Sequence, residues 1–516
     1  MKGYDKNTKQ IFNGVAWLGL SAIILKLIGL VYKIPMSYLL GDEGMGYFNS
    51  AYTVYTFFYI IGSAGIPKAI SILSAKSTPG EAKRIFSVIF RIYVVIGIIL
   101  SVSLLCMSKF LASIIGSENA ALTILAIAPS VVFVCCSGVL RGYLNGKTKF
   151  VPIAISELIS GICKLLLGLA FAVFSIKNNF SLSAVCAFSI LGITIGSFFG
   201  FIYLYIYYKR ESENIKKEYI PQKTIIKDVF KIGLPIAFAA ALSNIVNVID
   251  LSIIMNRLIK SGYSETVSAA IYGNYTTLAV PIFSLVTNLL NTVTLASLPI
   301  MTKCFSERKY TELELSLNSS LKLSLFIAIP ACFLFLFFSY ENLSVIFEIG
   351  SATLGTSFLF FLAPGVIFYS LLMMSNTILE AEGRIKTAVS SLSVGALVKI
   401  LLSIILIGNN NFEALGAPIG TSISYAVSFF ISICAINKNK NFKMPVFNSL
   451  INTVIISILS LIPTLLFKST IQISQNIRIN SLIILIIYAV FYLTFSSFST
   501  IKTKKRERLS AKCTKN

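Results

Sequence analysis

Six basic residues lie deep inside hydrophobic segments of this sequence, five of them in its first half: Lys26, Lys33, Lys68, Arg91, Lys164 and Lys399. A charge at the centre of a bilayer costs roughly 2.5 to 3.5 kcal/mol even on the most lenient insertion scale, so such residues usually face a polar cavity or an anionic partner. These residue types at this depth predict a protein that holds or moves an anionic group inside a membrane.

Lys164 and Lys399 are the most informative of these cations. Each lies about 13 residues into its apolar segment, or roughly 20 Å along a helix, where the side chain cannot easily reach the interface. Lys33, Lys68 and Arg91 lie nearer to segment ends, so snorkelling toward water is an equal alternative for them. Lys26 is seven residues before Lys33, and two helical turns place the pair on nearly the same face.

Two acidic residues lie clearly within the apolar segments, Glu157 and Asp250. Glu157 is seven residues before Lys164, and its spacing is compatible with either a structural ion pair or a functional role. Asp250 could pair with Arg257, two turns further on, or serve as a cation or proton site. We therefore assign Glu157, Asp250 and Arg257 to gating or coupling, as candidates.

Histidine and cysteine usage excludes several kinds of chemistry. The sequence contains no histidine, which removes Ser-His and Cys-His triads, H-E-x-x-H zinc sites and histidine proton relays. The nine cysteines include the adjacent Cys135 and Cys136, but they form no C-x-x-C motif. We expect buried free thiols, with no metal site, no cofactor and no enzymatic activity.

The elements that must position these residues are membrane-spanning helices. Hydrophobic residues make up 56% of the chain and charged residues 13%, about half the charged share of an ordinary globular domain. Apolar segments of about 20 residues, enough to cross roughly 30 Å of hydrocarbon, recur along the chain. We predict an all-α polytopic membrane protein with about 14 spans; the first two are residues 11–34 and 47–74, and the seventh is 229–255.

The distribution of positive charge predicts the orientation of the spans. Cytoplasmic loops carry an excess of Lys and Arg, and placing the N-terminus in the cytoplasm puts most of the 44 basic residues there. Both termini are then cytoplasmic. The net charge of +23 is explained by this topology and by attraction to anionic phospholipids, so no nucleic acid is expected as a partner.

The chain divides into two similar halves. Residues 1–208 form a predicted N-lobe of six spans, 209–228 a charged cytoplasmic linker, 229–437 a C-lobe of six spans, 438–501 a C-terminal helix pair and 502–516 a basic cytoplasmic tail. An even number of spans in each half makes this a parallel repeat. Such repeats usually place the substrate between the lobes and work by alternating access.

Sequence similarity between the halves supports the repeat. Ala128-Pro129-Ser130-Val131-Val132-Phe133 parallels Ala363-Pro364-Gly365-Val366-Ile367-Phe368, and a short basic turn follows each string. The next span of each half carries a central lysine, Lys164 or Lys399. The alternative is that such strings recur by chance in apolar sequence.

Several short strings resemble the stage V sporulation protein B and polysaccharide-export family, which belongs with the MurJ-type lipid II flippases in the multidrug/oligosaccharidyl-lipid/polysaccharide exporter superfamily. The resemblance spans nearly the whole chain. Its strings are Tyr32-Lys33-Ile34-Pro35, Leu40-Gly41-Asp42-Glu43-Gly44-Met45-Gly46, Ala64-Gly65-Ile66-Pro67-Lys68-Ala69-Ile70-Ser71, Leu140-Arg141-Gly142-Tyr143, Asn247-Val248-Ile249-Asp250, Tyr272-Gly273, Gly395-Ala396-Leu397-Val398-Lys399-Ile400 and Gly416-Ala417-Pro418-Ile419-Gly420-Thr421.

The resemblance implies a V-shaped pair of six-helix lobes around a cationic cavity, with two extra C-terminal helices. The implied substrate is an undecaprenyl-pyrophosphate-linked cell-wall precursor, and the cavity would then also include Arg141. The sequence departs from the family where Lys33 and Lys164 replace arginines and Ser160 replaces a glutamate. Lysine keeps the charge but loses the bidentate geometry of arginine.

We therefore predict a flippase for lipid II or a related lipid-linked oligosaccharide, serving spore-cortex or vegetative peptidoglycan synthesis beside the cell-wall synthesis machinery. The first alternative is a cation-coupled multidrug antiporter of the same superfamily, which would favour intramembrane carboxylates. The second is a membrane glycosyltransferase or polymerase, which would normally carry a sizeable outer loop with acidic residues. The third is a scaffold that transports nothing and has no need of buried lysines.

Overall fold

Helices account for nearly all of the protein in the computed structural model. It describes residues 2–213, 215–407, 409, 412–438, 446–470 and 476–513. Eleven helical stretches among these residues are long and apolar enough to cross a membrane, or twelve if Glu118–Ile127 and Ser130–Gly146, bent by 43°, count as one span. The helices confirm the all-α polytopic prediction, although these eleven or twelve stretches are fewer than the predicted number of about fourteen spans.

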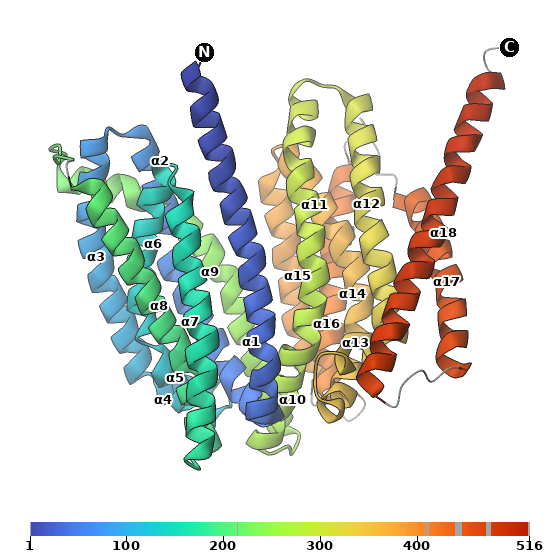
Figure 1. Ribbon diagram of the computed structural model, residues 1–516, viewed down its shortest axis with the longest axis horizontal. Coiled ribbons are helices and arrows are strands. Elements are labelled where there is room, and N and C mark those ends of the chain that lie inside the picture. Colours follow the sequence, from blue (N-terminus) through green and yellow to red (C-terminus); the bar gives the residue numbers. More distant parts are fainter. Residues whose placement is uncertain are drawn as a thin grey trace. The chain divides into compact units, whose positions relative to one another are not determined.

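The helices divide into two compact units, Met1–Gly273 and Asn274–Asn516. The first unit is drawn from blue to light green in Figure 1. Its elements are α1 (Lys2–Ser63), α2 (Gly65–Lys76), α3 (Pro79–Cys106), α4 (Ser108–Ile114), the 3₁₀ helix η1 (Glu118–Ala120), α5 (Ala121–Ile127), α6 (Ser130–Gly146), α7 (Phe150–Lys177), α8 (Leu182–Ser212), α9 (Gln222–Lys260) and α10, which runs across the boundary (Glu265–Asn274).

Helix α1 carries the first predicted span and most of the second. It is 62 residues long, and its helical geometry breaks at Gly41, with φ 64° and ψ −176°. A residue with a Cβ would be strained at this positive φ, so glycine is suited to the bend. The bend redirects the chain, and residues after it supply Tyr52, Tyr55 and Tyr59 to the interior of the unit.

The second unit follows the same construction with additional C-terminal helices. Its elements are the π-helix η2 (Tyr275–Ala279), α11 (Val280–Ser306), α12 (Tyr310–Phe337), α13 (Ser339–Ser344), α14 (Ile349–Ala381), α15 (Ile385–Leu406), the 3₁₀ helix η3 (Glu413–Leu415), α16 (Gly416–Asn437), α17 (Val446–Thr470) and α18 (Ile477–Cys513).

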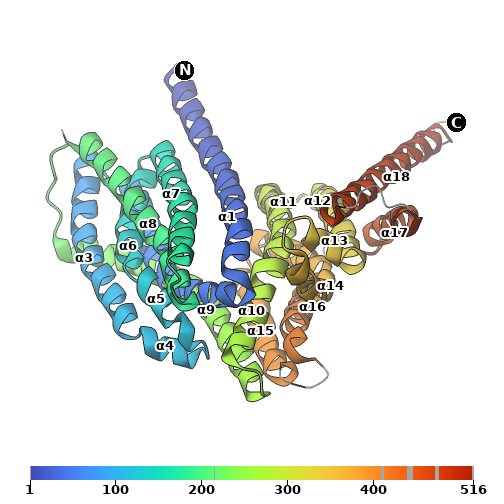
Figure 2. The same cartoon turned by 60° about the horizontal axis from the view of Figure 1, so that its bottom comes forward.

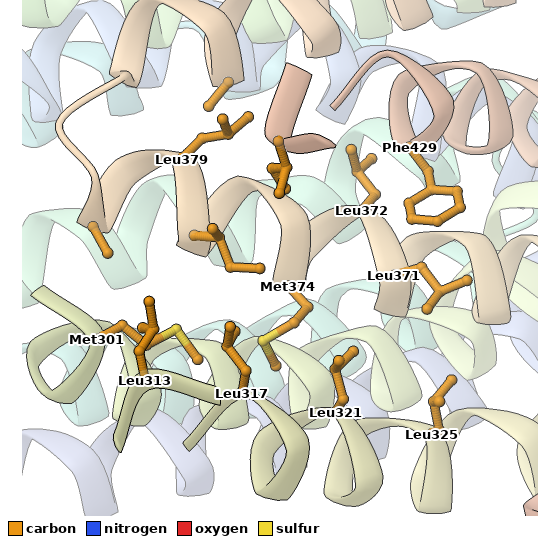
Figure 3. Packing of buried hydrophobic residues seen from close by; sticks show 14 of the residues in the cluster. Met301, Leu313, Leu317, Leu321, Leu325, Leu371, Leu372, Met374, Leu379 and Phe429 are labelled. Atoms are coloured by element: carbon orange, nitrogen blue, oxygen red, sulfur yellow. The ribbon is translucent and has the colours of Figure 1, made fainter. Parts of the chain in front are cut away.

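The core of the second unit is a layer of leucine and methionine between α12 and α14. Leu313, Leu317 and Leu321 recur every fourth residue on α12, so they share one face of the helix. Figure 3 shows Leu371 and Met374 of α14 among them, and these side chains are almost fully buried. This apolar interface fixes α12 against α14.

The lysine-bearing helix of each unit packs against the next helix in the same way. A Cβ added to Gly192 of α8 would lie 3.0 Å from the Lys164 carbonyl oxygen on α7, and one added to Gly420 of α16 would lie 3.5 Å from the Lys399 carbonyl oxygen on α15. Both approaches place backbone against backbone beside the lysine. The sequence parallel between the halves therefore has a counterpart in local packing.

Candidate functional site

A cavity of about 460 Å³ lies inside the first unit, among α1, α6, α7 and α8. Its lining combines three tyrosines, several hydroxyls and three charged side chains. The residues are Leu25, Tyr52, Tyr55, Thr56, Tyr59, Val134, Ser137, Arg141, Glu157, Ser160, Gly161, Lys164, Ile193 and Ser197. Three of the predicted site residues, Arg141, Glu157 and Lys164, thus meet in one place.

Glycines bring the helices of this site into close contact. Gly192, Gly196 and Gly200 recur every fourth residue on α8, and a Cβ at any of them would come within 3.0 Å of the α7 backbone or of Ser160. Small residues at this spacing let membrane helices approach closely. The α7 backbone is therefore held directly against α8, which sets the register of Ser160 and Lys164 toward the cavity.

Lys164 is held by aromatic ring faces. Its Nζ lies 4.9 Å from the centre of the Tyr32 ring and 5.2 Å from the centre of the Tyr52 ring. A ring face attracts a cation without neutralising its charge. Lys33 lies close enough for the two ammonium groups to repel each other. The positive charge near Lys164 is thus available to an anion.

Arg141 and Glu157 form an ion pair in the same cavity. The Nη1 of Arg141 is 3.3 Å from Oε1 of Glu157, and the two side chains are 23% and 30% exposed. The Nε of Arg141 is buried without a hydrogen-bond partner. The guanidinium therefore has a donor to spare, and the three charged groups of the cavity leave a net charge of +1.

The tyrosines of the cavity were not predicted from the sequence. Tyr52, Tyr55 and Tyr59 form a ladder along α1, with 5.9 Å between successive ring centres. Their spacing of three and four residues places them on one face of a helix, and this stripe was the signal available in the sequence. A stripe of aromatic residues in an apolar span usually indicates ordinary packing. Only the position of the cavity shows that these tyrosines line a candidate binding site.

The remaining predicted residues of the first unit lie outside this cavity lining. Lys68 on α2 and Arg91 on α3 are exposed, Asp250 on α9 is buried, and Arg257 is half-buried on the same helix. Lys26 belongs to α1, but its side chain lies outside the described part of the structure. Their assigned roles stay predictions.

Lys399 belongs to the second unit, where it is half-buried on α15. On the same helix, Ser391 bonds to Asn376 of α14 and Ser432 of α16, and these buried hydrogen bonds join the three helices. These polar contacts are interhelical bonds, as expected for most polar residues within spans. The predicted role of Lys399 in substrate binding also stays a prediction.

The described cysteines are all free thiols, and the prediction that they are buried is wrong for Cys106 and Cys434, which are exposed. Among the described residues, no group of three acidic or cysteine side chains is placed to hold a metal ion. The chemistry of the cavity is thus that of fixed charges, aromatic rings and hydroxyls. Such a set can bind and orient a polar, anionic group.

Comparison with known proteins places this geometry in context. Lipid II flippase MurJ of Bacillus subtilis (strain 168) is 24% identical over 462 residues, which cover 84% of each chain. Stage V sporulation protein B of the same organism is 22% identical over 422 residues, or 80% of each chain. A solved structure of lipid II flippase MurJ in an inward closed conformation matches 94% of this chain and 99% of that one, with a TM-score of 0.75 at 18% identity.

Family models cover both units. The MatE model matches residues 235–405. The model for polysaccharide biosynthesis proteins matches residues 11–305, which is more than half of the chain. The chain is thus a multi-pass membrane protein of a transporter superfamily, with bacterial relatives and no enzyme among these matches. It belongs to the polysaccharide biosynthesis protein family.

Proposed function

We propose that this protein moves an undecaprenyl-pyrophosphate-linked cell-wall precursor from the inner to the outer leaflet by alternating access. The precursor is lipid II or a related lipid-linked oligosaccharide, for spore-cortex or vegetative peptidoglycan. Both termini are cytoplasmic in this proposal. The observation that carries it is the Lys164 ammonium, which lies in a membrane-embedded polar cavity against ring faces instead of a carboxylate.

The cavity offers separate groups of side chains for the diphosphate and for the sugar of such a substrate. Lys164, with Lys33 nearby, supplies positive charge for the diphosphate. Tyr52, Tyr55 and Tyr59 supply ring faces on which the apolar face of a sugar can stack, and Ser137, Ser160 and Ser197 supply hydroxyls. Lys26, Lys68, Arg141 and Lys399 are further proposed contacts along the path, while Glu157, Asp250 and Arg257 gate or couple the movement. Arg91 is exposed on α3 and is not among the residues that line the cavity, so we do not place it on the path.

The experiment compares lipid II binding by wild type, Lys164→Gln and Lys164→Arg, using native mass spectrometry of the detergent-extracted full chain. A hydrogen bond to a charged group contributes about 1.5 to 3 kcal/mol, so Lys164→Gln is expected to weaken binding roughly 10- to 100-fold. Lys164→Arg keeps the charge and should retain most of the binding. Lys177→Gln removes one charge from the exposed end of the same helix and serves as the matched control.

Flipping is then measured in reconstituted vesicles with the same variants. The proposal predicts that Lys164→Gln loses flipping while Lys177→Gln keeps it. Equal binding and equal flipping by wild type and a folded Lys164→Gln variant would contradict the proposal. If the protein instead binds a different carrier-linked glycan selectively, and Lys164→Gln loses that binding, only the identity of the sugar in the proposal would change.

A second candidate function is a cation-coupled multidrug antiporter. It is favoured by the MatE match over residues 235–405 and by the burial of Asp250 within that range, with 7% of the residue exposed. Sodium- or proton-dependent dye efflux that disappears in Asp250→Asn would support this candidate. The net positive charge of the cavity opposes it, because cationic drugs need carboxylates.

A further inference from the structure

Arg91 lies on the outward face of α3 instead of in the cavity. Val95, Ile98, Ile99 and Val102 follow it at helical spacing, and each of these four side chains is between 48% and 57% exposed. Figures 1 and 2 both place α3 along the edge of the first unit. An exposed apolar stripe of this length on a spanning helix faces lipid, so the exposed Arg91 lies on the lipid side.

The position of Arg91 on a lipid-facing stripe is costly without an anion. Arg91 lies seven residues, about 10 Å along the helix axis, after Arg84, where the third predicted span begins. Arg84 is two turns before it and projects from nearly the same face. The Nε of Arg84 is buried without a hydrogen-bond partner. The guanidinium groups of Arg84 and Arg91 therefore lie on the same face of α3, and both can donate further hydrogen bonds.

The linker between α8 and α9, which carries Lys217, is docked against the first turns of α3. Lys83 donates hydrogen bonds from Nζ to the carbonyl oxygens of Ser212, at 2.5 Å, and Ile215, at 2.7 Å. Gly80 permits a close approach, because a Cβ there would lie 2.7 Å from the Lys216 carbonyl oxygen. The linker backbone is thus fixed beside the first turns of α3.

Lys217 is held next to the two arginines by this docking. Burial lowers the pKa of Lys217, and the charges of Arg91, Lys83 and Arg84 lower it further. The neighbouring acids bond to Thr78: Glu218 accepts a hydrogen bond from its hydroxyl at 2.7 Å, and Glu81 accepts one from its backbone at 2.9 Å. The charges that shift the pKa of Lys217 are those of the three cations, with no carboxylate among them.

We propose that Arg84, Arg91 and Lys217 bind the phosphate headgroup of an anionic phospholipid, with its acyl chains along the stripe from Val95 to Val102. Guanidinium groups match phosphate oxygens in geometry and charge. The apolar stripe continues directly from the cations, as it must for one lipid to occupy both. With the orientation proposed above, this lipid belongs to the inner leaflet; the site itself does not depend on the transported substrate.

The test is native mass spectrometry of the full chain with phosphatidylglycerol, phosphatidylcholine and undecaprenyl diphosphate in separate samples. The variant Arg84→Gln/Arg91→Gln is expected to bind phosphatidylglycerol about tenfold more weakly than wild type, because charge-assisted hydrogen bonds are lost. Arg84→Lys/Arg91→Lys keeps the charge and should bind at an intermediate level. Lys223→Gln/Lys227→Gln removes the same charge from exposed positions of α9 and should bind like wild type.

Three results would overturn the proposal. Wild type could bind phosphatidylcholine as well as phosphatidylglycerol, or the folded Arg84→Gln/Arg91→Gln variant could bind phosphatidylglycerol as well as wild type. The third is a variant that loses undecaprenyl diphosphate and keeps phosphatidylglycerol, which would assign the cluster to the transport path. Thermal unfolding of each variant in detergent verifies that it is folded.

Discussion

The ring faces of Tyr32 and Tyr52 stabilise the Lys164 ammonium without cancelling its charge. A cation–π contact contributes about 0.5 to 2 kcal/mol, less than a buried carboxylate would, and it leaves the field of the cation open to an incoming anion. Arg141 differs, because Glu157 lies 3.3 Å away and offsets its charge. Lys164 is therefore the stronger candidate for binding a diphosphate. Glu157 lowers the net positive charge of the cavity in which the diphosphate would bind.

Replacing Glu157 with glutamine should strengthen binding of an anionic substrate. The change raises the net charge of the cavity from +1 to +2 and frees the Arg141 guanidinium. Attraction at an effective dielectric near 20 then favours a diphosphate, and we expect lipid II binding to tighten about threefold to tenfold. Native mass spectrometry measures this, and flipping should slow because release is harder.

The double variant Arg141→Gln/Glu157→Gln is the control for that prediction. It restores the net charge of +1, so its binding should return toward the wild-type level. Weaker binding by Glu157→Gln alone would mean that Glu157 contacts the substrate or organises the cavity, and the charge argument would be wrong.

At the scale of elements, backbone contacts between helices decide where the functional side chains lie. Gly192 meets Gly168, and Gly200 meets Ser156 and Ser160, so α7 and α8 are in contact along the whole height of the cavity. The C-terminal helices are positioned by a different device, an ion pair between Lys468 of α17 and Glu341 of α13. One interface depends on small residues and the other on charge.

Gly192→Ala tests the first interface. The added Cβ would lie 2.5 Å from the Gly168 nitrogen, and because that atom belongs to the backbone, the helices must move apart. Overpacking of this kind costs about 1 to 3 kcal/mol, so the thermal midpoint in detergent should fall and lipid II binding should weaken. Gly350→Ala, where a Cβ meets nothing within 4 Å, should leave both unchanged. An unaltered midpoint in Gly192→Ala would show that α7 and α8 tolerate separation.

Lys468→Gln tests the second interface. Its ammonium is 2.5 Å from Oε1 of Glu341, whose side chain is only 5% exposed, at a cavity of about 320 Å³. Removing the partner of a buried carboxylate is destabilising; we expect about 1 to 3 kcal/mol, below the range for fully buried pairs because Lys468 is 40% exposed. The thermal midpoint reports this loss.

The matched control for this pair is Glu341→Gln/Lys468→Met, which removes both charges together. It should recover most of the lost stability, since no unpaired charge remains at the cavity. If the double variant is as unstable as Lys468→Gln, the cation–π contact of the Lys468 ammonium with the Phe338 ring matters more than its ion pair with Glu341.

At the scale of the whole molecule, the structure places α9 and most of α10 in the first compact unit, Met1–Gly273. Gly65 of α2 explains part of this, because a Cβ there would lie 2.2 Å from the Gly233 carbonyl oxygen of α9. The functional lobes, divided at the linker of residues 209–228, stay a proposal about what moves. The π-helix Tyr275–Ala279 directly follows the unit boundary.

The proposed orientation predicts opposite results for two fusions. A green fluorescent protein after residue 516 should fluoresce, because that end of the chain is placed in the cytoplasm. Alkaline phosphatase inserted after Gly262, in the turn between α9 and α10, should be active on the outer side. Gly262 suits the insertion, since its surroundings are open. If the phosphatase is inactive and the C-terminal fusion does not fluoresce, the proposed orientation is wrong and the topology is the inverse.

The two related halves stay a prediction, while the sequence by itself determined the all-α polytopic class and the deep cations in its apolar segments. These depend on local properties, because an apolar segment of spanning length must satisfy its backbone hydrogen bonds within itself, whatever its neighbours are. The pairing of Arg141 with Glu157 and the gathering of both with Lys164 needed the tertiary structure.

Only the packing of helices decided which side of each span meets lipid, cavity or core. Arg91 and Lys164 are both cations in apolar segments of the sequence, yet one lies on an outward stripe and the other against tyrosine rings. The tyrosine stripe of α1 is visible in the sequence, but only the structure shows that it lines a cavity, and the docking of Lys217 beside α3 has no signal in the sequence. Rotation of a helix about its axis is set by contacts between distant segments, and no local pattern in this chain encodes it.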